Sequence, residues 1–100
     1  MMLEIALSSA ASHFSQEHLL FGRRYILEFQ WLERESYWVM HIYDGSEQPQ
    51  ALGLKVMLNW PIYVDKVSGI VFLLVEKTRN AQITRDALYK DFVVVVHELI

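Results

Sequence analysis

The chain has 100 residues, enough for one domain with one hydrophobic core. Nine basic against twelve acidic side chains give a formal charge of −3, which offers no basic stripe for nucleic acid, and the absence of cysteine excludes disulfides, thiolate catalysis and cysteine zinc sites. Hydrophobic residues make up 53% of the chain, more than one small core needs, so the composition predicts burial against other chains.

The first fifth of the chain predicts two strands. Residues 2–7 alternate loosely and form a first strand, and the small residues of 8–12 form a linker. Residues 13–20 are a second strand, with Phe14 as its clearest core residue, although an amphipathic helix is an alternative here. Residues 21–23 form a tight turn in which Gly22 provides the permissive backbone.

Residues 24–44 predict the central β-hairpin. Alternate residues from Tyr25 to Trp31 are apolar, and the alternation resumes from Trp38 after the polar loop 33–36. If that loop closes the hairpin, Trp31 lies opposite Trp38 and both apolar sets occupy one face. A slip of one residue would turn one set towards water, so the pattern predicts a single register. The same register places Glu28 opposite His41 on the other face.

The next elements are less regular. A turn over residues 44–49, starting at Asp44, leads to a strand over 50–58, in which alternation predicts Leu52, Leu54, Val56 and Leu58 on one face and a possible bulge at Gly53. Trp60 before Pro61 interrupts the pattern, and residues 62–67 are assigned to a connection.

The last third of the chain holds two apolar strands and a polar loop. Residues 69–76 form a continuous apolar run, as expected of a strand covered on both faces. Residues 77–90 are a long polar loop with one helical turn around 84–89, and residues 92–99 form the last strand. Seven short strands separated by turns predict one domain over residues 1–100, an all-β fold that is a small antiparallel β-barrel or sandwich.

The residues that carry chemistry do not form a recognisable site. The four histidines have no metal-binding spacing, and no nucleophile motif or phosphate-binding loop occurs. We therefore expect no enzyme activity, no specific divalent metal and no cofactor. The apolar runs are far shorter than the ~20 residues that span a bilayer, and no signal peptide is recognisable, so we expect no membrane association and synthesis in the cytoplasm.

Landmarks along the chain resemble a known family. Their order is a Leu-Glu-Ile strand, Gly22 before Tyr25, Trp31 with Glu33 and Arg34, Trp38, Ile42-Tyr43-Asp44, Gly53-Leu54, Trp60-Pro61 and the approach to the last strand at 86–89. Together they resemble the baseplate plug family of contractile-tailed phages, first described in a cyanophage baseplate. The likeness runs from about Leu3 to Leu99, and Tyr25, Trp31, Arg34, Trp38, Tyr43, Asp44 and Trp60 are its signature positions.

This resemblance implies a structural protein of a phage or prophage virion that packs near the hub and spike at the end of the tail tube. The implied partners are other baseplate proteins of hub, spike or tube-initiator type, together with copies of itself in a trimer or a symmetric assembly. No catalytic residues come with the family. Two other classes stay open at this point: a small β-barrel module that binds nucleic acid or a ligand, and a small enzyme acting on sugars or esters.

Overall fold

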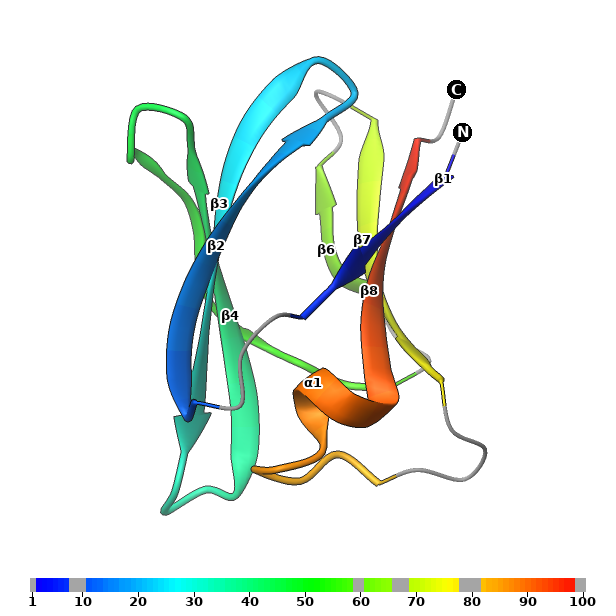
Figure 1. Cartoon of the computed structure of the whole chain (residues 1–100). Helices are drawn as coiled ribbons and strands as arrows, with labels where there is room; N and C mark the ends of the chain where they lie inside the picture. Colours follow the sequence, from blue (N-terminus) through cyan, green and yellow to red (C-terminus); the bar gives the residue numbers. More distant parts are fainter. Residues whose placement is uncertain (1, 8–10, 59–60, 66–68, 78–81, 99–100) are drawn as a thin grey trace.

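A computed structural model describes residues 2–7, 11–58, 61–65, 69–77 and 82–98, and two antiparallel sheets of four strands face each other in it (Figure 1). The first sheet has the order β1 (Met2–Ala6), β8 (Phe92–Glu98), β7 (Ile70–Glu76) and β6 (Pro61–Asp65). The second has the order β2 (His13–Leu20), β3 (Arg23–Leu32), β4 (Tyr37–Asp44) and β5 (Pro49–Lys55). The all-β prediction is confirmed, and the fold is a sandwich rather than a closed barrel.

The central hairpin has the predicted register. β3 and β4 pair with Trp31 opposite Trp38 and Glu28 opposite His41. The two indole rings lie 5.8 Å apart between centroids, at 61° to each other, an edge-on arrangement that suits their quadrupoles. The alternate residues of both strands face the interior, where Trp38 is fully buried and Trp31 is partly buried. The hydrophobic pattern therefore determined this register correctly.

β2 is a strand and not the alternative helix. It pairs with β3 over its whole length, and the Phe21–Gly22 turn has positive φ at both residues, 49° and 84°, as a two-residue hairpin turn requires. Phe14 is only partly buried, stacked on Phe29 with centroids 5.2 Å apart. The fully buried residue of this strand is Leu20, at its other end.

β5 corrects one predicted face. Gly53, with a φ of 69°, forms the expected bulge, so that two residues of β5 lie opposite His41 alone. The extra residue ends the simple alternation, and Leu52 is 57% exposed instead of facing the core with Leu54. Regular pairing also stops at Lys55, before the predicted end, and Leu58 forms a separate parallel bridge to Leu74 of β7.

β6 is the strand that the sequence pattern missed, because residues 62–67 were assigned to a connection. Pro61–Asp65 pairs with β7, with Val64 opposite Val71, after an irregularity near Pro61. A proline fits at the first residue of a strand, where no ladder hydrogen bond is lost. The local pattern is weak because pairing with the strongly apolar β7 determines the conformation of this segment. Trp60 lies outside the described residues.

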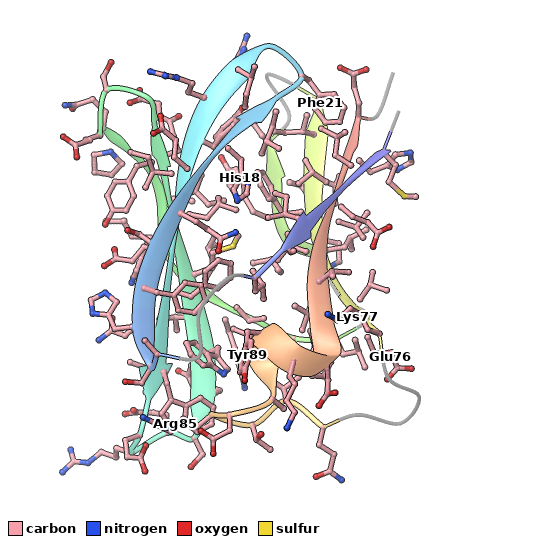
Figure 2. The ribbon with its side chains drawn as sticks, in the orientation of Figure 1. His18, Phe21, Glu76, Lys77, Arg85 and Tyr89 are labelled. Carbon is pink, nitrogen blue, oxygen red and sulfur yellow. The ribbon has the colours of Figure 1, made fainter. Side chains whose placement is uncertain are left out.

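The polar loop after β7 contains the expected helical turn, but α1 covers Leu88–Asp91, later than predicted. Leu88 is buried. The next residue, Tyr89, lies at one end of the sandwich in Figure 2. The backbone N–H of Lys77 donates to the carbonyl of Asp91 at 2.6 Å, joining the two ends of the loop. The indole N–H of Trp38 donates to the carbonyl of Thr84 at 2.9 Å, so the loop is anchored to the central hairpin.

The core lies between the sheets and receives residues from seven of the eight strands and from α1. Tyr25 of β3 meets Phe72 of β7 edge-on, with ring centroids 6.0 Å apart at 75°. The largest fully buried side chains are Trp38, Phe29, Phe72, Phe92, Leu27, Met40, Ile42, Leu88, Val94 and Val96. Because both sheets contribute, neither is expected to be stable without the other.

We predict that Trp38→Ala lowers the free energy of unfolding by about 3–5 kcal/mol, because it leaves a cavity at the centre of the core. Urea unfolding followed by circular dichroism measures this loss. Leu52→Ala is the matched control and should change stability by less than about 0.5 kcal/mol, since Leu52 is exposed. A loss below about 1 kcal/mol for Trp38→Ala would contradict the central place of this side chain.

Candidate functional site

The signature residues that the structure describes, which exclude Trp60, do not converge on one site. Tyr25, Trp31 and Trp38 belong to the core or pack against it. Arg34 is exposed in the loop between β3 and β4, and Tyr43 lies on the outer face of β4. Their spacing thus reflects the construction of the hairpin rather than a binding pocket.

Asp44 organises the loop between β4 and β5. One carboxylate oxygen, Oδ1, accepts hydrogen bonds from the backbone N–H groups of Ser46 and Gln48 at 2.9 and 3.0 Å. The other, Oδ2, accepts from the side-chain amide of Gln50 at 3.2 Å. An added Cβ at Gly45 would approach Cβ of Arg24 to 2.9 Å, so this turn also requires a residue without a side chain. Asp44 is therefore a turn-forming residue.

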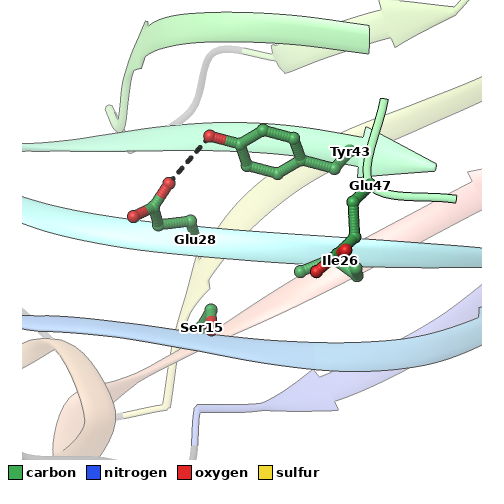
Figure 3. Close-up of a pocket in the computed structure, with 5 residues that line it drawn as sticks. All are labelled: Ser15, Ile26, Glu28, Tyr43 and Glu47. Carbon is green, nitrogen blue, oxygen red and sulfur yellow. Dashed lines mark hydrogen bonds between the residues drawn. The ribbon is translucent and has the colours of Figure 1, made fainter. Parts of the chain in front are cut away.

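The outer face of the second sheet carries a polar network centred on Glu28 (Figure 3). The hydroxyl of Tyr43 donates to Oε1 of Glu28 at 2.9 Å, and His13 is hydrogen-bonded to Oε2. The hydrogen bond from His13 lowers the pKa of Glu28, and that from Tyr43 adds to the effect against the opposing influence of burial. Because the Tyr43 hydroxyl donates its hydrogen bond to this carboxylate, the pKa of Tyr43 is raised.

A shallow depression of about 210 Å³ lies on this face, lined by Ser15, Ile26, Glu28, Tyr43 and Glu47. It is wide open, and two of the groups that line it, Glu28 and Tyr43, already bond to each other. His41, predicted to pair with Glu28, lies opposite it on the backbone but accepts a hydrogen bond at Nδ1 from the N–H of Gly53, 2.9 Å away. The polar side chains of this face largely satisfy each other and leave little for a ligand.

The outer face of the first sheet has the opposite character. Alternate residues of β8 and β7 face away from the core, and their register forms a grid: Val95 lies opposite Leu73, and Val93 lies opposite Val75. β6 adds Val64 beside Val71. We call this set the valine face, and its members are Val64, Val71, Leu73, Val75, Val93 and Val95.

The valine face is apolar, and its exposure is greatest at its margins. Val71, Val93 and Val95 are only 6–8% exposed, yet they are not part of the core cluster. Val64 and Val75 at its margins are 39% and 41% exposed. No other labelled helix or strand lies outside β7 and β8 in Figure 1. The prediction that β7 is covered on both faces agrees with the burial of most residues from Ile70 to Leu74, and the exposed outward-facing residue is Val75.

Charged groups border this face rather than interrupt it. Glu4 of β1 lies opposite Val95, and His97 of β8 lies opposite both Val71 and Met2. Met2 is itself 62% exposed, and His97 lies between it and Val71 in the sheet. An apolar centre with a polar margin is the anatomy of a protein–protein contact surface.

The described residues contain no cluster of three or more histidine, cysteine, aspartate or glutamate side chains that could hold a metal ion. Within the same residues, no helix is long and apolar enough to cross a membrane. What the geometry offers is a surface for association. A comparison with known protein families agrees: residues 2–98 match the family model described as cyanophage baseplate Pam3 plug gp18.

The chain belongs to this baseplate plug family. The match covers nearly the whole chain and confirms the resemblance found in the landmark residues. The plug is thus a structural component of a phage tail baseplate, and its place is the virion. No curated protein matches the chain.

The valine face is the feature that sequence reasoning located only in part. The runs that supply it, 70–75 and 92–96, were recognisable as unusually apolar. Which residues of each run face outwards depends on the pairing of β7 with β8 and on the position of the other sheet. The composition signalled an excess of apolar side chains, and the fold shows where part of that excess lies.

The network around Glu28 predicts a specific pH dependence. Because the pKa of Glu28 in the folded plug lies below its ordinary value of 4.5, the carboxylate stabilises the fold above that pH. This contribution is lost as the pH falls through the lowered pKa. The melting temperature of wild type should exceed that of Glu28→Gln at pH 6, and the difference should shrink as the pH falls below 4.5 and through the lowered pKa.

Glu35→Gln in the exposed hairpin loop is the matched control, since it also removes one negative charge. Its melting temperature should follow wild type across the same range. A Glu28→Gln difference that stays constant from pH 6 to pH 3 would contradict a stabilising role of the ionised carboxylate.

Proposed function

We propose that the plug is a non-enzymatic packing module that contacts hub- or spike-type proteins at the end of the tail tube. The observation that carries this proposal is the valine face, an apolar sheet surface that is exposed at Val64 and Val75 and has no labelled helix or strand outside it in Figure 1. Its central side chains are branched and held rigidly by the sheet, so docking a partner there costs little side-chain entropy.

The same proposal includes the assembly of several copies. A stable contact removes about 1,200 Å² or more of total surface, and the valine face is a natural centre for one such contact. We also propose that the plug is made in the host bacterial cytoplasm and binds neither nucleic acid nor membrane. The net charge of −3 supports the first of these exclusions.

The alternative of a small nucleic-acid- or ligand-binding β-barrel lacks a supporting observation. Single-strand binding needs exposed aromatic side chains beside a basic groove. In the plug, Trp38 is buried and Trp31 packs against the core. The polar face that remains is centred on a carboxylate, Glu28, which would repel phosphates.

The proposal predicts that charges placed at the margin of the valine face abolish binding to the hub. The double variant Val64→Lys with Val75→Glu should raise the Kd for the purified hub protein at least about tenfold, since each change buries a charge in an apolar contact. Both positions are already exposed in the isolated chain, so the fold should survive. Light scattering and titration with the hub measure the effect.

Leu52→Glu is the matched control, because Leu52 is an exposed apolar residue on the other sheet. It should bind the hub as wild type does. Equal weakening by the control, or unchanged binding by the double variant, would contradict the assignment of the valine face. A wild-type plug that binds neither hub nor spike would contradict the proposed function itself.

A further inference from the structure

Three of the four edge strands in the sandwich are built in ways that resist further strand pairing. β1 has only five residues. β5 starts at Pro49 and is bulged at Gly53, and β6 has five residues, starts at Pro61 and has an irregular register. Short edges, prolines and bulges are known protections against edge-to-edge association. β2 has none of them: its eight residues pair with β3 in one unbroken register.

One hydrogen bond shows which residues of β2 direct their backbone N–H and C=O groups away from β3. The N–H of Trp31 donates to the carbonyl of Ser12 at 2.8 Å, so these two residues form a hydrogen-bonded pair at the start of the ladder. Such pairs alternate in antiparallel sheets, which directs every second residue of β2 to β3 and the others away from it. The residues whose N–H and C=O point away from β3 are His13, Ser15, Glu17 and Leu19.

We infer that this edge pairs with the same edge of a second copy of the plug, antiparallel, about a two-fold axis at Gln16. In that register His13 faces Leu19 of the second copy, and Ser15 faces its Glu17. All four outward-directed residues of each strand then exchange hydrogen bonds. The resulting sheet would run continuously through both copies, a known mode of strand addition.

The neighbouring registers pair fewer of the outward-directed residues. Centring the axis on Ser15 or on Glu17 uses only three outward-directed residues of each strand, and the second choice places the Glu17 carboxylates opposite each other. A shift of one residue in one strand would set outward-directed backbone groups against groups already bonded to β3. The Gln16 register is therefore the antiparallel one that satisfies the whole edge.

The side chains on the outer face agree with this pairing, whereas the Gln16 side chain donates to the carbonyl of Ala6 in β1 at 3.0 Å. Leu19 is 68% exposed in the isolated chain, and the pairing places it beside the His13 ring of the second copy. Glu17, which lies 3.5 Å from Arg24, keeps that partner and gains the hydroxyl of Ser15 opposite it. Figure 1 shows β2 on the other sheet from β7 and β8, so a pair of copies joined through β2 leaves both valine faces available.

This inference deepens the assembly part of the proposed function, and it is tested on the isolated protein without any hub. The chain has no cysteine, so one introduced thiol is unique. Opposed residues without mutual hydrogen bonds lie about 4.5 Å apart between Cα atoms, within the range of about 4.4–6.8 Å for disulfides. Gln16→Cys should therefore form a disulfide-linked dimer under mild oxidation at micromolar concentration.

Ser15→Cys and Glu17→Cys are the register controls. In each variant the introduced thiol lies directly opposite the same thiol of the second copy only in one of the two rejected registers. Both should cross-link at least about tenfold more slowly than Gln16→Cys. Circular dichroism verifies that all three variants are folded. Cross-linking of either control as fast as Gln16→Cys, or no cross-linking of Gln16→Cys, would overturn the inference.

A second measurement removes one hydrogen-bond donor from the free edge. Ser15→Pro deletes an N–H that points away from β3, so the intramolecular ladder is kept. Sedimentation should show a dimer Kd raised about tenfold or more, while Ser15→Ala, which keeps the N–H, stays near wild type. A monomeric wild type, or unchanged dimerisation of Ser15→Pro, would refute the pairing, whereas loss of hub binding alone would bear only on the valine face.

Discussion

The pairing of β3 with β4 is the interaction on which the rest of the sandwich depends. It places Trp38 at the centre of the core, edge-on to Trp31, and directs the Trp38 indole N–H to the carbonyl of Thr84 in the loop before α1. The same strands present Tyr25 to Phe72 of the opposite sheet. One hairpin thus anchors its own sheet, the facing sheet and the longest loop, because its buried face is continuous.

The outer faces of the two sheets differ in polarity. On the second sheet, Glu28 accepts from Tyr43 and His13, so the polar groups bond to one another. On the first sheet, the valine face has no polar side chains to bond, and it is exposed at its margins, at Val64 and Val75. Burial by another chain removes that apolar surface from water, which is the usual driving force of association. This contrast explains why a small sandwich without visible chemistry suits a structural role in a baseplate.

The valine face and the free edge of β2 use different physical means and lie on different sheets. The first relies on apolar area, and the second relies on unpaired backbone groups directed outwards at residues such as Ser15 and Glu17. If both proposed contacts form, the plug binds a copy of itself and a different partner at the same time. A plug held within a larger assembly requires contacts of this kind in more than one direction.

Much of this fold was determined by the sequence alone. Strict alternation from Tyr25 to Trp31 and from Trp38 onwards left one register, because any slip exposes aromatic side chains to water. The strand β6 and the exposure of Leu52 were decided only by tertiary structure: β7 provides the partner that makes Pro61–Asp65 extended, and the Gly53 bulge turns Leu52 outwards. The valine face was also decided only by tertiary structure, because a continuous apolar run does not show which of its two faces the other sheet will cover.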